Sequence, residues 1–135
     1  MAYIPEDITE LLCVDMGCIG QDLNCSEYDV SICAKDSSGP YDYQMTGDLI
    51  AMAKKHQLQY AVDIYPYYGS DASAALRAGH DIRAAPIGAG VFASHGYERS
   101  TMEAVAQSMM LVSYYFTKQQ NNEETPLKTK GVRSK

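Results

Sequence analysis

The chain has 135 residues, of which 46% are hydrophobic and 21% are charged, and its formal net charge is −6. This length suits one domain or part of one, and the apolar content is sufficient for a core. The acidic balance, without a basic stripe, argues against nucleic acid and against an anionic membrane surface as partners.

Targeting and redox features are sparse. No stretch approaches the ~20 apolar residues of a membrane span, and the N-terminus lacks the basic start and apolar run of a signal peptide. Four cysteines stand at Cys13, Cys18, Cys25 and Cys33, without a C-x-x-C pair. We therefore expect free thiols in a reducing, cytoplasmic setting rather than a zinc ribbon or a redox motif.

The first half of the chain predicts two strands separated by a loop. Residues 10–16 form an apolar run that ends near Asp15, and residues 28–34 alternate between apolar and polar positions. A break follows at residues 35–40, where Ser, Gly and Pro gather. Asp63 lies in the middle of a later strand, where either core pairing or a functional role remains open.

Helices and strands alternate in the second half. Apolar spacing predicts a helix at 41–57, a strand at 57–65, a helix at 70–79 capped by Ser70, a strand at 82–88 and a final helix from Ser100. We expect the final helix to bury an apolar face that includes Met102 and Met109. Residues 118–135 are polar and predict a frayed, disordered tail, so the predicted domain is 1–117.

This order predicts an α/β fold with a mostly parallel sheet flanked by helices, and consecutive strands side by side. Ligands bind such sheets at the carboxyl ends of the strands. Asp15, the Ser70–Asp71 turn and His95 each follow a strand, so we expect them to meet at one edge. Asp and neutral His suit zinc or cobalt.

Each of these residues also has a structural interpretation. Asp15 is suited to capping a backbone amide, and His95 to a hydrogen bond with a loop carbonyl. Asp71 in the first turn of a helix is favoured by the helix dipole. The residue pattern by itself leaves these alternatives open.

Four strings carry a resemblance to a known family. The chain resembles the M42 metallo-aminopeptidases, some of whose members are labelled endoglucanases, from about Pro5 to Phe116. The strings are Val-Asp-Met-Gly at 14–17, Lys-Asp-Ser-Ser-Gly-Pro-Tyr-Asp at 35–42, Tyr-Gly-Ser-Asp-Ala at 68–72 and Ser-His-Gly-Tyr-Glu-Arg at 94–99. The resemblance implies the C-terminal part of a phosphorylase/hydrolase-like zinc-peptidase catalytic domain.

The same resemblance implies a site. In that family, two zinc or cobalt ions are held by five protein ligands. Asp15 would bind one ion and His95 the other, and Ser70 and Asp71 would line the substrate pocket. The early His, the bridging Asp and the Glu-Glu pair that includes the general base have no counterpart here, because Glu123-Glu124 lies in the polar tail.

We therefore predict a metal-dependent aminopeptidase that removes N-terminal residues from peptides. The chain is expected to be a fragment with an incomplete site, inactive alone, and to form a homo-oligomer. Two alternatives remain: an endo-1,4-β-glucanase, which would need two carboxylates and no metal, or a non-catalytic fragment that associates with itself.

Overall fold

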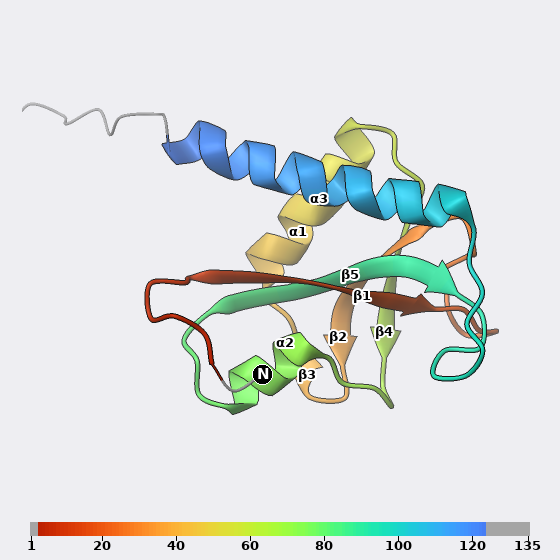
Figure 1. Ribbon diagram of the computed structural model, residues 1–135, viewed down its shortest axis with the longest axis horizontal. Helices are drawn as coiled ribbons and strands as arrows, with labels where there is room; N and C mark the ends of the chain where they lie inside the picture. The colour runs from red at the N-terminus through yellow and green to blue at the C-terminus, as the bar shows by residue number, and fades with distance from the viewer. Residues whose placement is uncertain (1–2, 124–135) are drawn as a thin grey trace, which may run out of the picture.

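Residues 3–123 are described by a computed structural model, shown in Figure 1. Its elements, in chain order, are β1 (Glu10–Cys18), β2 (Val30–Asp36), β3 (Gly39–Pro40), α1 (Tyr43–Lys55), β4 (Tyr60–Tyr65), α2 (Asp71–Arg77), β5 (Arg83–Val91) and α3 (Met102–Glu123). Strands and helices alternate after β3, which confirms the predicted α/β class. None of the helices in this range is long and apolar enough to cross a membrane.

The strands form one mixed sheet in which most of the paired length is parallel. β1 pairs with β5 in parallel over its full length, from Glu10 opposite Arg83 to Cys18 opposite Val91. β2 pairs in parallel with β4 on one edge. On its other edge, β2 pairs antiparallel with β5 through 30–32 and with β3 at 35–36. In Figure 1 the arrows of β2 and β4 run across those of β1 and β5.

The strand order corrects one prediction. β1 pairs with β5, the last strand in the chain, and β5 separates β1 from β2. Consecutive strands are therefore not neighbours at this edge. The short strand β3 lies within the segment that was predicted as a break. Its first residue, Gly39, adopts φ 131°, which a residue with a Cβ rarely reaches.

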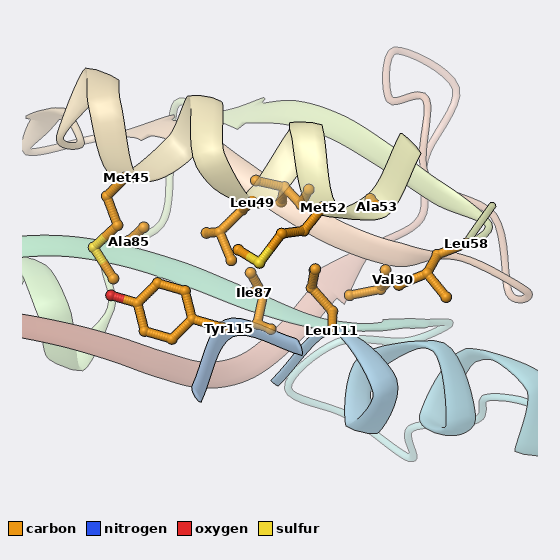
Figure 2. Close-up of a cluster of buried hydrophobic side chains, with 11 residues drawn as sticks. Val30, Met45, Leu49, Met52, Ala53, Leu58, Ala85, Ile87, Leu111 and Tyr115 are labelled. Carbon is orange, nitrogen blue, oxygen red and sulfur yellow. The ribbon is translucent and has the colours of Figure 1, made fainter. Parts of the chain in front are cut away.

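The main core lies between the sheet and helices α1 and α3. Figure 2 shows Leu49 and Met52 of α1, Ile87 of β5, and Leu111 and Tyr115 of α3 converging on one cluster. Each fully buried aliphatic side chain contributes about 1.5–3 kcal/mol. This layer holds β2 and β5 together where they cross. A smaller cluster, which includes Ala72 of α2, forms on the opposite side of the sheet.

The buried face of α3 differs from the predicted one. Met102 is 80% exposed and Met109 is 65% exposed, whereas Ala104 and Leu111 are fully buried. The apolar period was correct, but the wrong stripe was assigned to the core. The buried stripe carries Ala104, Ser108, Leu111 and Tyr115, and the methionines lie outside it.

Both ends of α3 also differ from the prediction. The helix begins at Met102, and Thr101 caps it by accepting a hydrogen bond from the Ala104 amide (3.2 Å). Ser100 instead donates to the Gly90 carbonyl (2.6 Å). At the other end the helix continues to Glu123, so residues 118–123 of the predicted tail are helical. Residues 124–135 lie outside the described range.

Candidate functional site

A cavity of about 60 Å³ opens on the side of the sheet away from α1 and α3. It lies among β1, β2, β5, the segment that precedes α2 and the turn that follows β5. Its lining is Asp15, Met16, Cys18, Ser31, Cys33, Asp36, Tyr41, Tyr65, Tyr68, Gly69, Ser70, Pro86, Ile87, Gly88, Ser94 and His95. Three of the four predicted site residues, Asp15, Ser70 and His95, are therefore brought together.

Asp15 lies within β1 rather than at its end. Its side chain is exposed, and its Oδ1 accepts a hydrogen bond from the Met16 amide (2.9 Å). It pairs in register with Gly88 of β5, where an added Cβ would lie 2.1 Å from the Asp15 carbonyl oxygen. Glycine at 88 is thus required for the backbone of β5 to lie against the backbone that carries Asp15.

The route by which these residues meet is not the predicted one. β4, which leads toward Ser70, runs parallel to β2, and β2 is antiparallel to β5, which leads toward His95. Their carboxyl ends do not share an edge. The residues meet because the two pairs of strands cross and because the segment after β4 folds back, with the Ser37 amide donating to the Tyr68 carbonyl (2.9 Å).

His95 occupies a tight turn in a strained backbone conformation. His95 has φ 65° and Ala93 has φ 55°, values that residues other than glycine seldom adopt. The His95 amide donates to Oε1 of Glu98 (3.0 Å), and the imidazole stacks on Tyr68 with ring centroids 5.6 Å apart. Such strain persists only where neighbouring contacts hold it, and it gathers at functional sites.

Ser70 and Asp71 are separated by the structure. Ser70 caps α2 in a reciprocal capping box with Ser73 and lines the cavity. Asp71 is the first residue of α2, is exposed, and is not part of the cavity lining. Its position agrees with its structural interpretation, in which the helix dipole favours a carboxylate in the first turn.

Four polar cavity residues, Ser31, Asp36, Tyr41 and Tyr65, were missed from the sequence. Asp36 is 4% exposed, and it accepts hydrogen bonds from the Ser38 amide (2.8 Å) and the Tyr41 hydroxyl. Tyr65 bonds to Ser31 (hydroxyl oxygens 2.6 Å apart) and accepts from the Cys18 amide (3.3 Å). The apolar residues around Tyr65 signalled burial, but Asp36 stood in a turn-like string that resembled a solvent-exposed break.

Asp63, which the sequence left open, is a structural residue. It is 5% exposed, and its carboxylate accepts three hydrogen bonds, from the Asn24 amide (2.8 Å), the Asn24 side chain (3.1 Å) and the Cys25 amide (2.9 Å). These bonds attach the loop that follows β1 to β4. Asp63 is not part of the cavity lining.

Two buried thiols, Cys25 and Cys33, are held neutral. Burial raises the pKa of Cys33 to about 12, and burial together with Asp29 and Asp63 raises the pKa of Cys25 to about 12. The same burial raises the pKa of the Tyr65 hydroxyl well above its ordinary value. A thiolate is the reactive form of cysteine, so this environment does not support a nucleophilic role for Cys25 or Cys33. All four cysteines are free.

The donor set tests whether these residues suit a metal ion. Asp15 and His95 are suitable ligand types for zinc or cobalt, and within residues 3–123 the imidazole nitrogens of His95 have no hydrogen-bond partner. However, no group of three or more His, Cys, Asp or Glu in that range is arranged to hold a metal ion. The described residues therefore do not form a metal centre by themselves.

Comparison with known proteins identifies the family. Residues 2–111 match the M42 glutamyl aminopeptidase family. A protein of Bacillus subtilis (strain 168) named "Putative aminopeptidase YhfE" is 51% identical over 112 residues, which are 83% of this chain and 32% of that protein. The chain thus spans about a third of that relative's length.

Solved structures agree on the fold. PhTET1-12s, solved as a dodecamer, matches with a TM-score of 0.67 at 15% identity, over 84% of this chain and 34% of that one. The aminopeptidase APDkam598 of Desulfurococcus kamchatkensis matches with a TM-score of 0.65 at 17% identity, over 96% of this chain and 38% of that one. With its sequence matched over residues 2–111, the chain belongs to the M42 glutamyl aminopeptidase family.

Proposed function

We propose that this chain forms part of a metal-dependent aminopeptidase that removes N-terminal residues from peptides. The observation that carries the proposal is that Asp15 of β1 and His95 of the turn after β5, which are far apart in the sequence, line one cavity. Membership of an aminopeptidase family supplies the reaction class. In such a site, a metal ion would make a bound water nucleophilic near neutral pH.

The site proposed here is one part of a larger centre. Asp15 and His95 would contribute one ligand each to a pair of zinc or cobalt ions. No glutamate lines the cavity within the described residues, so the general base would come from outside this chain. We therefore propose that the chain is a C-terminal part of the catalytic domain and is inactive alone. Because its four cysteines are free, we also propose that it acts in the cytoplasm.

Self-association is part of the same proposal. Met102, Met109 and Phe116 expose 80%, 65% and 59% of their surface on α3. Exposed apolar side chains of this kind favour association, and PhTET1-12s was solved as a dodecamer. The endoglucanase alternative has no support among the relatives described above, all of which carry aminopeptidase or TET names.

Metal binding by the purified chain tests the assignment of ligands. Calorimetric titration with zinc and with cobalt is expected to show weak binding that Asp15→Ala and His95→Ala each reduce. His80→Ala and Asp81→Ala are matched controls, because both residues lie outside the cavity lining. Equal binding by all five proteins would show that Asp15 and His95 are not ligands.

Hydrolysis tests the reaction class. Aminoacyl-p-nitroanilides are incubated with the chain, with and without added metal and chelator. We expect no turnover by the chain alone, and metal-dependent turnover when Asp15 and His95 are present in a longer family member. Glucan hydrolysis that survives a chelator would refute the proposed function in favour of a glycosidase.

A further inference from the structure

The turn that carries His95 has a backbone held by contacts within the turn itself. Phe92 and Arg99 close the turn with two backbone hydrogen bonds (2.8 and 3.1 Å), and the Arg99 guanidinium lies 4.9 Å from the centroid of the Phe92 ring. Inside it, the Gly96 amide donates to the Ala93 carbonyl (2.8 Å). These contacts hold the backbone in the strained conformation seen at His95. None of them involves the imidazole.

The imidazole of His95 has one partner among the described residues, and that partner is an aromatic ring. His95 is exposed, and no hydrogen bond reaches its ring nitrogens within residues 3–123. The ring of Tyr68 lies against it, with centroids 5.6 Å apart and planes inclined by 20°. Aromatic pairs are favourable at centroid separations of about 4.5–7 Å. The stack is therefore the contact that restrains the rotation of this side chain.

Tyr68 is supported by a different part of the fold. It lies between β4 and α2, and both of its peptide groups are hydrogen-bonded. Its carbonyl accepts from the Ser37 amide (2.9 Å), which follows β2, and its amide donates to the Tyr65 carbonyl (3.5 Å) at the end of β4. Tyr68 and His95 both line the cavity. The stack thus joins two cavity walls that come from separate segments of the chain.

Contact through the ring face suits a histidine that must bind a metal ion. The nitrogen lone pair and the N–H bond of an imidazole lie in the plane of its ring, so a partner on the face occupies neither. A ligand histidine is usually oriented by a hydrogen bond from its second nitrogen to a carboxylate, a carbonyl or water. His95 makes no such bond to the described residues, and Tyr68 is in a position to supply the orientation instead.

We propose that Tyr68 is a positioning residue for His95, which orients the imidazole through its face and leaves both ring nitrogens free. The inference rests on the proposed function for the role of His95 as a metal ligand. Because the ring performs this task and the hydroxyl does not, phenylalanine replaces Tyr68 and an aliphatic residue does not. Loss of the aromatic pair lowers the population of oriented imidazole, and with it the affinity for zinc, by about twofold to tenfold.

NMR spectra of the 135-residue chain without metal test the contact itself. With labelled histidine and tyrosine rings, we expect nuclear Overhauser effects between Tyr68 and His95, and ring-current shifts at the imidazole protons of His95. His56 is an internal reference, because it stacks on Tyr114 between α1 and α3, with centroids 3.5 Å apart. If His56 showed these effects to Tyr114 while His95 showed none to Tyr68, the proposal would be overturned.

Substitutions at Tyr68 separate the ring from its hydroxyl. Tyr68→Leu is expected to return the His95 signals toward those of a free imidazole and to lower the order parameter of that ring, with the signals of His56 unchanged. Tyr68→Phe is expected to keep the wild-type values. Tyr67→Leu is the matched control, because Tyr67 is the adjacent residue, is 89% exposed and lies outside the cavity lining. Equal changes in Tyr68→Phe and Tyr68→Leu would assign the effect to the hydroxyl and would refute the face contact.

Calorimetric titration with zinc connects the orientation of the ring to ligation. We expect Tyr68→Leu to bind zinc about twofold to tenfold more weakly than the wild type, and Tyr68→Phe and Tyr67→Leu to bind it equally well. A merely structural role for Tyr68 would lower the urea midpoint of Tyr68→Leu and leave its zinc affinity unchanged, and that result would overturn the proposal. If Tyr68→Leu does not fold, the spectra of the wild type and of Tyr68→Phe decide.

The two kinds of measurement also separate this inference from the proposed function. Absence of zinc binding by the wild-type chain would refute the assignment of His95 as a ligand. The contact between Tyr68 and His95 is measured in metal-free spectra, so its presence or absence is decided independently of that result.

Discussion

Gly88→Ala is the substitution whose effect the structure defines most sharply. The added Cβ would lie 2.1 Å from the Asp15 carbonyl oxygen and 2.8 Å from the Met16 Cα, where ordinary contacts begin at 3.4 Å. Both neighbours are backbone atoms, so no side chain can rotate away, and β1 must move from β5 by an amount set by a shortfall of 1.3 Å (3.4 minus 2.1). Overpacking of this kind costs about 1–3 kcal/mol, and each hydrogen bond lost between the strands adds about 1 kcal/mol.

Equilibrium urea unfolding of the purified chain measures this cost. With a slope of about 1–3 kcal/mol per molar urea, a loss of about 3 kcal/mol lowers the midpoint by roughly 1–3 M. Gly47→Ala is the matched control: Gly47 lies inside α1 with no atom within 4 Å of an added Cβ. There the same substitution stabilises by about 0.5–1 kcal/mol. If both variants moved the midpoint in the same direction, the contact argument at Gly88 would be wrong.

Three further predictions concern buried polar groups. Asp63→Asn is expected to lower stability by about 1–3 kcal/mol in the same urea assay, because an amide replaces a carboxylate that accepts three hydrogen bonds. Iodoacetamide near neutral pH is expected to label Cys18, which lines the cavity and is partly exposed, before Cys33, as peptide mass spectrometry would show; the reverse order would contradict the burial argument. The contribution of Cys25 and Cys33 to stability is expected to be constant below pH 9 and to fall between pH 9 and about 12, because burial raises their pKa from 9.0 to about 12 and the unfolded chain loses those protons first. Urea midpoints at about pH 8 and about pH 11 test this, and equal midpoints would refute it.

Local patterns predicted most of the secondary structure, because the apolar residues of a strand or a helix repeat within a few positions of the sequence. The strand predicted at 10–16 is β1 (Glu10–Cys18), and the helix predicted at 41–57 is α1 (Tyr43–Lys55). The order of the strands was not available from the same patterns. The pairing of β1 with β5 joins residues far apart in sequence, and it depends on Gly88 permitting close backbone contact. A lone glycine in an apolar run indicates such a contact only after the partner strand is known.

The site shows the same division between local and distant information. Asp15, Ser70 and His95 were predicted to lie together and do so, although the shared strand edge that motivated the prediction does not exist. Asp36 was missed because a buried aspartate and an exposed turn aspartate are identical in sequence. Asp36 is buried because β3 turns the chain back along β2 and so brings the hydroxyl of Tyr41 to its carboxylate.

The described residues complete the polar wall of the cavity but not its set of metal ligands. The wall formed by Asp36, Tyr41 and Ser70 is completed by hydrogen bonds among described residues. The ligand set is not, since no three donors gather within residues 3–123. Side chains whose hydrogen bonds are already made within the chain are ordered without a further partner. Asp15 is exposed and His95 lies in a turn, so these two ligands become fully rigid only when further ligands bind the same metal ions. It follows that metal affinity should rise steeply only when additional donors are supplied.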